Sequence, residues 1–266
     1  MHPPYSWFVR TSTLLLAATN SPLLADTSPQ NDSVNVELPS EFRSINGSNN
    51  NLRHPEWGTA DQTFIRIIPA RYADGKDAPS GAGLANTRSL SNALSAQKKS
   101  IENRDLASDF LWQWGQFLDH DITETRVISP AEPFNISVPK SDTWFDPLGT
   151  GKVIIPMNRS FYEYVDGIRQ QVNAVTAYID ASNVYGSDET RARALRRLDG
   201  SGKLKTIETI HGEMLPYNLT GLDNAPANSP NFFLAGEVRA NDQPGLTAMH
   251  PLFVREHNYQ ASEYKK

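Results

Sequence analysis

A histidine flanked by two carboxylates is the feature of this sequence with the clearest chemical potential. Asp119, His120 and Asp121 follow one another at the end of an apolar run that begins at Trp112. Gln116 lies four residues before His120, so a helix would place both side chains on one face. Two carboxylates beside an imidazole are costly to bury unless each has a partner, such as a metal ion or a covalent bond. The segment therefore predicts either a reactive cluster or a helix end whose carboxylates lie in water.

Oxygen-bearing residues recur at every second position in a later segment. Thr176, Tyr178, Asp180 and Ser182 would line one side of an extended loop. Hydroxyls, a backbone carbonyl and a carboxylate are the hard ligands that Ca²⁺ prefers, and Asp121 is a candidate for a second carboxylate. The alternative is a half-exposed strand with ordinary polar alternation.

An arginine and an aspartate lie close together on a loop bounded by glycine and proline. Arg239 and Asp242 fall between Gly236 and Pro244, just before an apolar periodic segment. A fixed cation on such a loop suits the binding of an anion, or of an oxyanion that develops during a reaction. The alternative is an Arg–Asp pair at the surface, which contributes little to stability.

The elements that must position these residues are helices and one extended segment. Apolar spacings of three and four predict a helix from Asp105 to Asp119 and another from about Leu246 to the end, kinked or begun by Pro251. Alternation predicts extended structure over 172–179, and Ser187 is expected to cap a helix after it.

The N-terminal part of the chain is predicted to contain a signal peptide and an extended arm before the folded domain. Residues 26–60 are polar and are expected to form an extended arm, followed by the folded domain over 61–266. Residues 1–25 contain one charged side chain, Arg10, and short apolar runs, which is typical of a secretory signal peptide cleaved near Ala25. We therefore expect a secreted or periplasmic protein without a membrane span.

Composition excludes several classes of protein. The chain of 266 residues has no cysteine, which excludes a disulfide scaffold, a cysteine-ligated metal site and a thiol nucleophile. Its 25 Lys and Arg against 30 Asp and Glu give a net charge of −5, so nucleic acid is not an expected partner. Export without cysteine favours a bacterial origin.

Together, these segments resemble the animal-type haem peroxidase family. The resemblance covers roughly residues 45–266 and includes 49–58 and 66–79 as well as the three motifs above. It implies a mainly α fold, a haem-peroxidase-like helical domain with long irregular connections and few short strands, incomplete at its C-terminus. The helical pattern that stops at Lys266 agrees with a truncated bacterial member.

The resemblance also implies roles for individual residues. His120 matches the distal histidine, Gln116 the distal glutamine and Arg239 the catalytic arginine. Asp119 matches a carboxylate that forms an ester with haem, and Asp242 stands in the place of a second one that is usually Glu. The residues matching the family's calcium site are Asp121, Thr176, Tyr178, Asp180 and Ser182.

The function implied is a haem- and calcium-dependent peroxidase that uses hydrogen peroxide to oxidise halide, thiocyanate or phenolic donors. In the family the proximal haem histidine lies beyond the end of this sequence, which leaves a second hypothesis open: a non-catalytic secreted calcium-binding or adhesion module. A third is a fatty-acid dioxygenase of the cyclooxygenase type, against which the calcium loop and the paired Asp119 and Asp242 argue.

Overall fold

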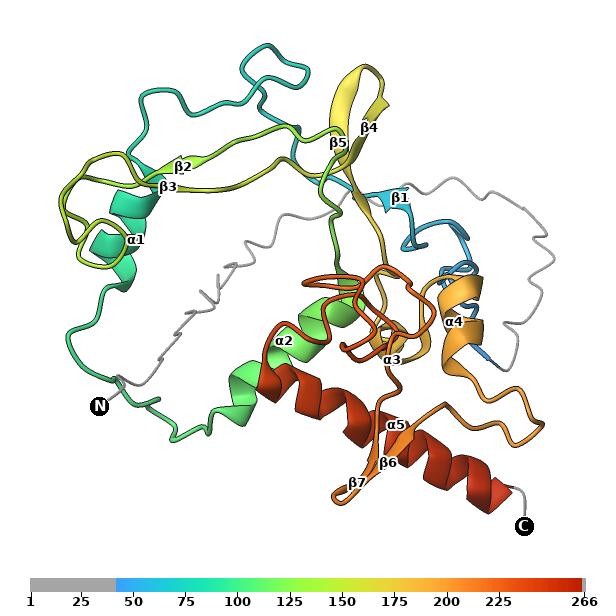
Figure 1. Ribbon diagram of the computed structural model, residues 1–266. Helices are drawn as coiled ribbons and strands as arrows, with labels where there is room; N and C mark the ends of the chain where they lie inside the picture. Colours follow the sequence, from blue (N-terminus) through green and yellow to red (C-terminus); the bar gives the residue numbers. More distant parts are fainter. Residues whose placement is uncertain (1–41, 265–266) are drawn as a thin grey trace.

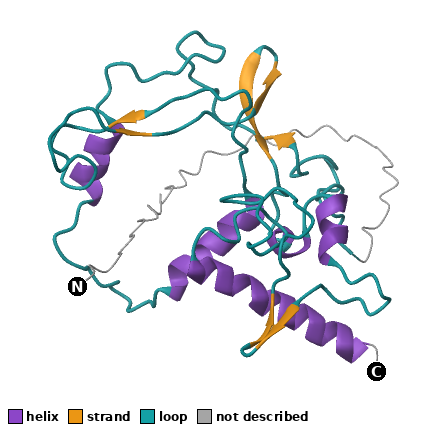
Figure 2. Cartoon of the chain, in the orientation of Figure 1, coloured by secondary structure: helices purple, strands orange, loops and turns teal. Residues whose placement is uncertain are grey.

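A computed structural model describes residues 42–264 (Figure 1). The predicted signal peptide and its cleavage point near Ala25 lie outside the described residues. Helices account for more residues than strands, so the mainly α fold with long irregular connections is confirmed (Figure 2). In chain order the elements are β1 (Gln62–Thr63), α1 (Thr87–Ser95), α2 (Phe110–Ile122), β2 (Ile136–Ser137), β3 (Ile154–Ile155), β4 (Tyr162–Val165), β5 (Ile168–Asn173), α3 (Ser182–Tyr185), α4 (Glu189–Leu195), β6 (Ile207–Thr209), β7 (Gly212–Met214) and α5 (Pro244–Tyr264).

The centre of the fold is the contact between α2 and α5, which meet at an angle in the lower half of Figure 1. Phe117 of α2 is buried and stacks on Phe253 of α5, with ring centroids 4.7 Å apart. Leu246 and Val254 of α5 bury their apolar side chains in the same cluster. This apolar contact fixes the second half of α2 against the first half of α5.

Helix α2 begins and ends later than the periodicity predicts. Leu106 adopts a left-handed conformation (φ 55°) in a turn closed by its N–H and the Asn103 carbonyl, so the helix cannot start at residue 105. At the other end the helix continues to Ile122, and the Thr123 N–H closes it on the Asp119 carbonyl. His120 and Asp121 therefore lie within the last helical turn.

The prediction of extended structure over 172–179 is wrong beyond residue 173. Strand β5 is the middle strand of an antiparallel sheet with order β1-β5-β4, and it ends at Asn173. The Asn173 side chain donates to the Ile122 carbonyl and accepts from the Glu124 N–H, which ties the strand end to the end of α2. The chain then turns into an irregular loop, and α3 starts after Ala181, which has φ 60°.

Two helix starts also differ from expectation. Asp188, not Ser187, caps α4, because its carboxylate accepts the Arg191 N–H at 2.8 Å. Helix α5 starts at Pro244 and runs through Pro251 as one element of 21 residues. Among residues 42–264, no helix combines the length and apolar character needed to cross a membrane.

Helix α1 and the β2–β3 pair lie on an arm away from the helical centre (Figure 1). The Arg88 guanidinium of α1 donates two hydrogen bonds to the Asp142 carboxylate, at 2.7 and 3.1 Å, which fastens α1 to the connection between β2 and β3. The described part of the segment before residue 61 forms successive turns, with Thr59 and Ala60 buried.

Candidate active site

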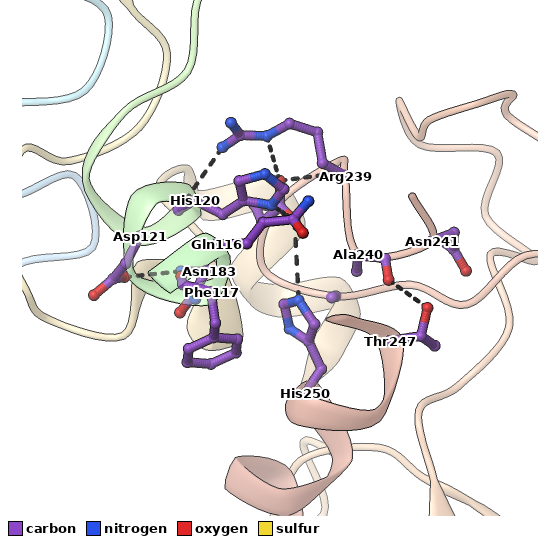
Figure 3. A network of polar contacts seen from close by, with 12 residues as sticks. Gln116, Phe117, His120, Asp121, Asn183, Arg239, Ala240, Asn241, Thr247 and His250 are labelled. Atoms are coloured by element: carbon purple, nitrogen blue, oxygen red, sulfur yellow. Dashed lines mark hydrogen bonds and ion pairs between the residues drawn. The ribbon is translucent and has the colours of Figure 1, made fainter. Parts of the chain in front are cut away.

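A buried carboxylate joins the histidine of α2 to the arginine of the loop before α5. Glu237 Oε1 lies 3.2 Å from His120 Nδ1, and Glu237 Oε2 accepts the Arg239 backbone N–H at 2.7 Å and Nε–H at 2.8 Å. The Glu237 side chain is 0% exposed. Figure 3 shows His120 and Arg239 side by side in this network. The fold therefore brings together two residues that are 119 positions apart in the sequence.

The charges around Glu237 explain why a buried carboxylate is tolerated. Burial by itself raises the pKa of Glu237, but the hydrogen bond from His120 and the positive charge of Arg239 outweigh it, and the pKa is lowered overall. Glu237 is therefore an anion that accepts hydrogen bonds and donates none.

Arg239 is held along its length by α2 as well as by Glu237. Its Nη2 donates to the Thr123 carbonyl at 2.9 Å and to the His120 carbonyl at 3.3 Å. Among the described residues, none hydrogen-bonds Arg239 Nη1 or His120 Nε2. The pair thus presents one cationic N–H group and one ring nitrogen with no protein partner.

Gln116 is connected to the same loop through Gln243. Gln243 Nε2 donates to Gln116 Oε1 at 3.2 Å and to Gln113 Oε1 at 2.5 Å. Thr247 Oγ1 in the first turn of α5 donates to the Ala240 carbonyl at 2.8 Å, which fixes the loop to that helix (Figure 3). The loop is consequently anchored to both α2 and α5.

Asp119 and Asp242 differ from the buried members of the site because both side chains are exposed. Neither carboxylate has a hydrogen-bond partner among the described residues. Partial burial raises the pKa of Asp242, the His120 interaction lowers it, and the charge of Glu237 raises it further. Two carboxylates free of protein partners thus lie next to the cluster.

Four of the five predicted calcium ligands have side chains that lie together near the end of α2, and the side chain of the fifth, Tyr178, lies elsewhere. Asp121 Oδ1 lies 3.2 Å from Ser182 Oγ, and Asp121 Oδ2 accepts the Asp180 N–H at 3.1 Å. Thr176 Oγ1 donates to Asp180 Oδ1 at 3.0 Å. The Tyr178 hydroxyl instead donates to the Trp57 carbonyl at 2.5 Å, so that side chain is engaged elsewhere.

This oxygen cluster already contains a cation from the protein. Arg43 Nη1 donates to Asp180 Oδ2 at 3.2 Å. Burial raises the pKa of Asp180, Arg43 lowers it, and the charge of Asp121 raises it again. Within residues 42–264 no group of three or more His, Cys, Asp or Glu side chains could hold a metal ion. Any ion here would depend on hydroxyl and carbonyl oxygens besides the two carboxylates.

His250 is a further member of the site, beyond the candidates that the sequence indicated. Its ring is 0% exposed, lies edge-on to Phe117, and has Nε2 3.9 Å from Glu237 Oε1. Both ring nitrogens lack a hydrogen-bond partner among the described residues. Burial lowers the pKa of His250 to about 4, so the ring is neutral near pH 7. The only sequence signals were that Glu237 lies two residues before Arg239 and that His250 lies in the apolar segment that follows the loop.

Comparison with known proteins identifies the architecture. The family model described as animal haem peroxidase matches residues 42–266. The chain belongs to the animal haem peroxidase family. This peroxidase-family chain is 33% identical to myeloperoxidase of Mus musculus over 90% of its own length and 37% of that protein, and 34% identical to the peroxidasin homolog of Homo sapiens over 85% of its length and 18% of that protein. It thus spans about a third or less of these relatives.

Solved structures agree with this family assignment. Peroxidase A of Dictyostelium discoideum superposes with a TM-score of 0.73 at 29% identity, covering 84% of this chain and 46% of that one. Fatty acid alpha-dioxygenase of Oryza sativa superposes with a TM-score of 0.62 at 24% identity, covering 84% and 33%. The second likeness shows a shared fold alone.

The residues present fit the haem that the family binds. Asp119 and Asp242 have carboxylates without described protein partners, which is the condition for bonding to another group. His120 has its Nδ1 occupied by Glu237 and its Nε2 without a described partner. The donor set of the cluster is thus suited to a bound cofactor and a small reactant.

Proposed function

We propose that this chain contributes the peroxide-reacting side of a haem-dependent peroxidase that oxidises small donors such as halide, thiocyanate or phenols. The single observation that carries the proposal is the meeting of His120 and Arg239 at the buried Glu237 carboxylate, with His120 Nε2 left without a described partner. Membership of the animal haem peroxidase family supports it.

His120 is the proton acceptor and donor in this proposal. A neutral imidazole can take a proton from hydrogen peroxide at Nε2 and return it to the departing oxygen, acting first as general base and then as general acid. Helix α2 holds the ring at its last turn, where His120 is 5% exposed.

Arg239 supplies fixed positive charge. Its Nε and Nη2 are engaged by Glu237 and by the end of α2, so the guanidinium needs no rearrangement when negative charge develops on oxygen. Gln116, held through Gln243, is proposed to orient the reactant by hydrogen bonding.

Asp119 and Asp242 would hold the haem, by ester bonds in the family's manner, with Asp119 the stronger candidate. When bound, haem supplies the iron chemistry that transfers oxidising equivalents from peroxide to the donor. This chain's residues provide binding, orientation and proton transfer.

Calcium is proposed to bind at Asp121, Thr176, Asp180 and Ser182, with Tyr178 contributing its backbone carbonyl. The support is the set of oxygen atoms gathered at the end of α2, directly after His120. Two carboxylates would balance the charge of Ca²⁺. The ion would stiffen the helical turn that carries the imidazole. We also propose export to a secreted or periplasmic location, on the pattern of residues 1–25.

The test is haem capture by the purified chain, and turnover by a form that also supplies the proximal haem ligand. Haemin is titrated in the presence of calcium while the Soret absorption is recorded, and peroxide-dependent oxidation of iodide and of guaiacol is then measured. We expect His120→Ala to lower the rate about 10²–10⁴-fold and Arg239→Ala about 10²–10³-fold. His54→Ala, which changes an exposed histidine stacked on Trp57, is the control and should keep the full rate.

Equal turnover in the two site variants and in the wild type would overturn the assigned roles. A chain that takes up no haem but is stabilised by calcium would favour the non-catalytic calcium-binding module instead. Oxygen-dependent oxidation of a fatty acid in place of peroxide turnover would favour the dioxygenase.

A further inference from the structure

We propose that Glu237 is a positioning residue that fixes His120 in the Nδ1–H tautomer and so directs its Nε2 lone pair to the reactant. This inference rests on the proposed role of His120 as proton acceptor. It assigns Glu237 a role in the reaction that is exerted through His120, without contact between Glu237 and the reactant.

The hydrogen bonds of Glu237 allow only one position for the hydrogen of the neutral His120 ring. Its Oε2 is already occupied by two N–H groups of Arg239, at 2.7 and 2.8 Å. Its Oε1 faces His120 Nδ1 at 3.2 Å. An ionised carboxylate only accepts hydrogen bonds, so Nδ1 must carry the hydrogen. In a neutral imidazole the other nitrogen, Nε2, then keeps its lone pair.

The environment holds the carboxylate in this orientation. Glu237 is 0% exposed at its side chain, so water does not compete for Oε1. The other imidazole nearby, His250, has Nε2 at 3.9 Å from the same oxygen, beyond hydrogen-bond length. His120 is therefore the imidazole that Glu237 holds.

Backbone packing places Glu237 with little freedom. The preceding residue, Gly236, lies against the backbone of Asn183 and Gly186, where an added Cβ would come within 2.6 Å of each. Asn183 in turn donates from Nδ2 to the Phe117 carbonyl of α2 at 2.8 Å. The position of the carboxylate relative to the α2 turn is thus set by the fold and not by the His120 contact alone.

The experiment reads the tautomer directly in the haem-free full-length chain. Histidine labelled with ¹⁵N gives separate long-range ¹⁵N–¹H correlations for the two tautomers, and His120→Gln assigns the signal. We expect the wild type to show His120 as the Nδ1–H form. Glu237→Gln should yield a mixture or the Nε2–H form, because an amide can donate as well as accept. Glu237→Asp should keep the wild-type pattern.

Glu124→Gln is the matched control. Glu124 is a second partly buried acidic residue near Arg239 and Glu237, and among the described contacts its carboxylate does not reach the His120 ring. It should leave the tautomer unchanged. In the haem-loaded chain, Glu237→Gln should slow the reaction with peroxide about 10–100-fold, by analogy with the loss seen when the hydrogen-bond partner that orients a metal-ligating histidine is removed.

An Nε2–H signal for His120 in the wild type would overturn the proposal, even if Glu237→Gln failed to fold. So would an unchanged tautomer in a folded Glu237→Gln variant. A changed tautomer with an unchanged peroxide rate would instead uphold the positioning by Glu237 and refute the proposed role of His120.

Discussion

Gly236 packs directly against the backbone of Ser182. A Cβ at position 236 would overlap the Ser182 carbonyl oxygen and lie 2.6 Å from the carbonyl carbon of Asn183. This close approach joins the loop that carries Glu237 and Arg239 to the start of α3, where the Asp121 carboxylate accepts hydrogen bonds. The two halves of the site are thereby held as one unit.

Gly236→Ala should destabilise the chain by about 1–3 kcal/mol, because backbone atoms cannot move aside as a flexible side chain can. Thermal unfolding measures the change. Gly115→Ala is the control: this helical glycine in α2 has open space around it, and the substitution should stabilise the helix by about 0.5–1 kcal/mol. A Gly236→Ala variant as stable as the wild type would refute the packing constraint.

Arg191→Met should lower stability by about 2–4 kcal/mol, because two carbonyls lose their donor inside the protein. Arg191 is 6% exposed, its Nη1 donates to the Ala235 carbonyl at 3.0 Å, and its Nη2 donates to the Asp223 carbonyl. Denaturant unfolding gives the value. Arg193→Met changes the neighbouring exposed arginine, paired with Glu189 at 3.6 Å, and should cost about 0.5 kcal/mol or less. Similar losses in both variants would contradict this account.

Asp146 should make stability fall in acid. Hydrogen bonds from Gly151 N–H first, and from Thr150, lower its pKa from 3.8 to about 2. A carboxyl group with a depressed pKa in the folded state contributes stability that is present above about pH 4 and is lost as the pH falls toward 2. Denaturant unfolding from pH 6 to 2.5 should show a flatter profile for Asp146→Asn than for wild type. Asp105→Asn, at an exposed position, should leave the profile unchanged. If the free energy of unfolding of Asp146→Asn fell with pH as steeply as that of the wild type, Asp146 would not contribute to the acid sensitivity.

His250→Leu should leave stability at pH 7 unchanged or raise it, because the substitution removes two buried nitrogens that lack described hydrogen-bond partners. The folded-state pKa of His250 lies near 4, below its ordinary 6.5, so the unfolded chain binds the proton more tightly. The contribution of neutral His250 to the free energy of unfolding is therefore complete above pH 6.5 and is lost as the pH falls from 6.5 to 4. The variant should not show this loss. His54→Leu, at an exposed histidine, is the comparison. A marked loss of stability at pH 7 would show that the imidazole has a partner.

Calcium should raise the melting temperature of the wild type, and a chelator should reverse the effect. A ligand at 100 times its Kd stabilises the folded state by about 2.7 kcal/mol. Asp180→Asn should remove most of this gain, since one of two carboxylates is lost, whereas Glu189→Gln at an exposed position should keep it. If calcium raised the melting temperature of both variants equally, the ion would bind at another site.

The sequence by itself predicted the family, the mainly α fold and the segments that make up the site. Asp119, His120 and Asp121 are adjacent, and oxygen-bearing residues alternate from Thr176 to Ser182, so local spacing singled them out as candidates. Spacing also placed helices close to α2 and α5, although their bounds moved. The start of α2 moved because Leu106 forms a left-handed turn, and the extended segment ended early at Asn173, whose side chain makes a tertiary hydrogen bond to the end of α2. Periodicity encodes neither feature.

Only the tertiary structure decided which of these residues meet. Glu237 lies 117 positions from His120, and their contact depends on how the loop before α5 packs onto α2 and α3. The same packing buries His250 and joins Gln243 to Gln116. A separate tertiary contact turns the Tyr178 side chain toward Trp57. Sequence spacing specifies which side chains share a face of one element. Contacts between elements depend on close packing and on which buried charges find partners, and those are properties of the folded chain as a whole.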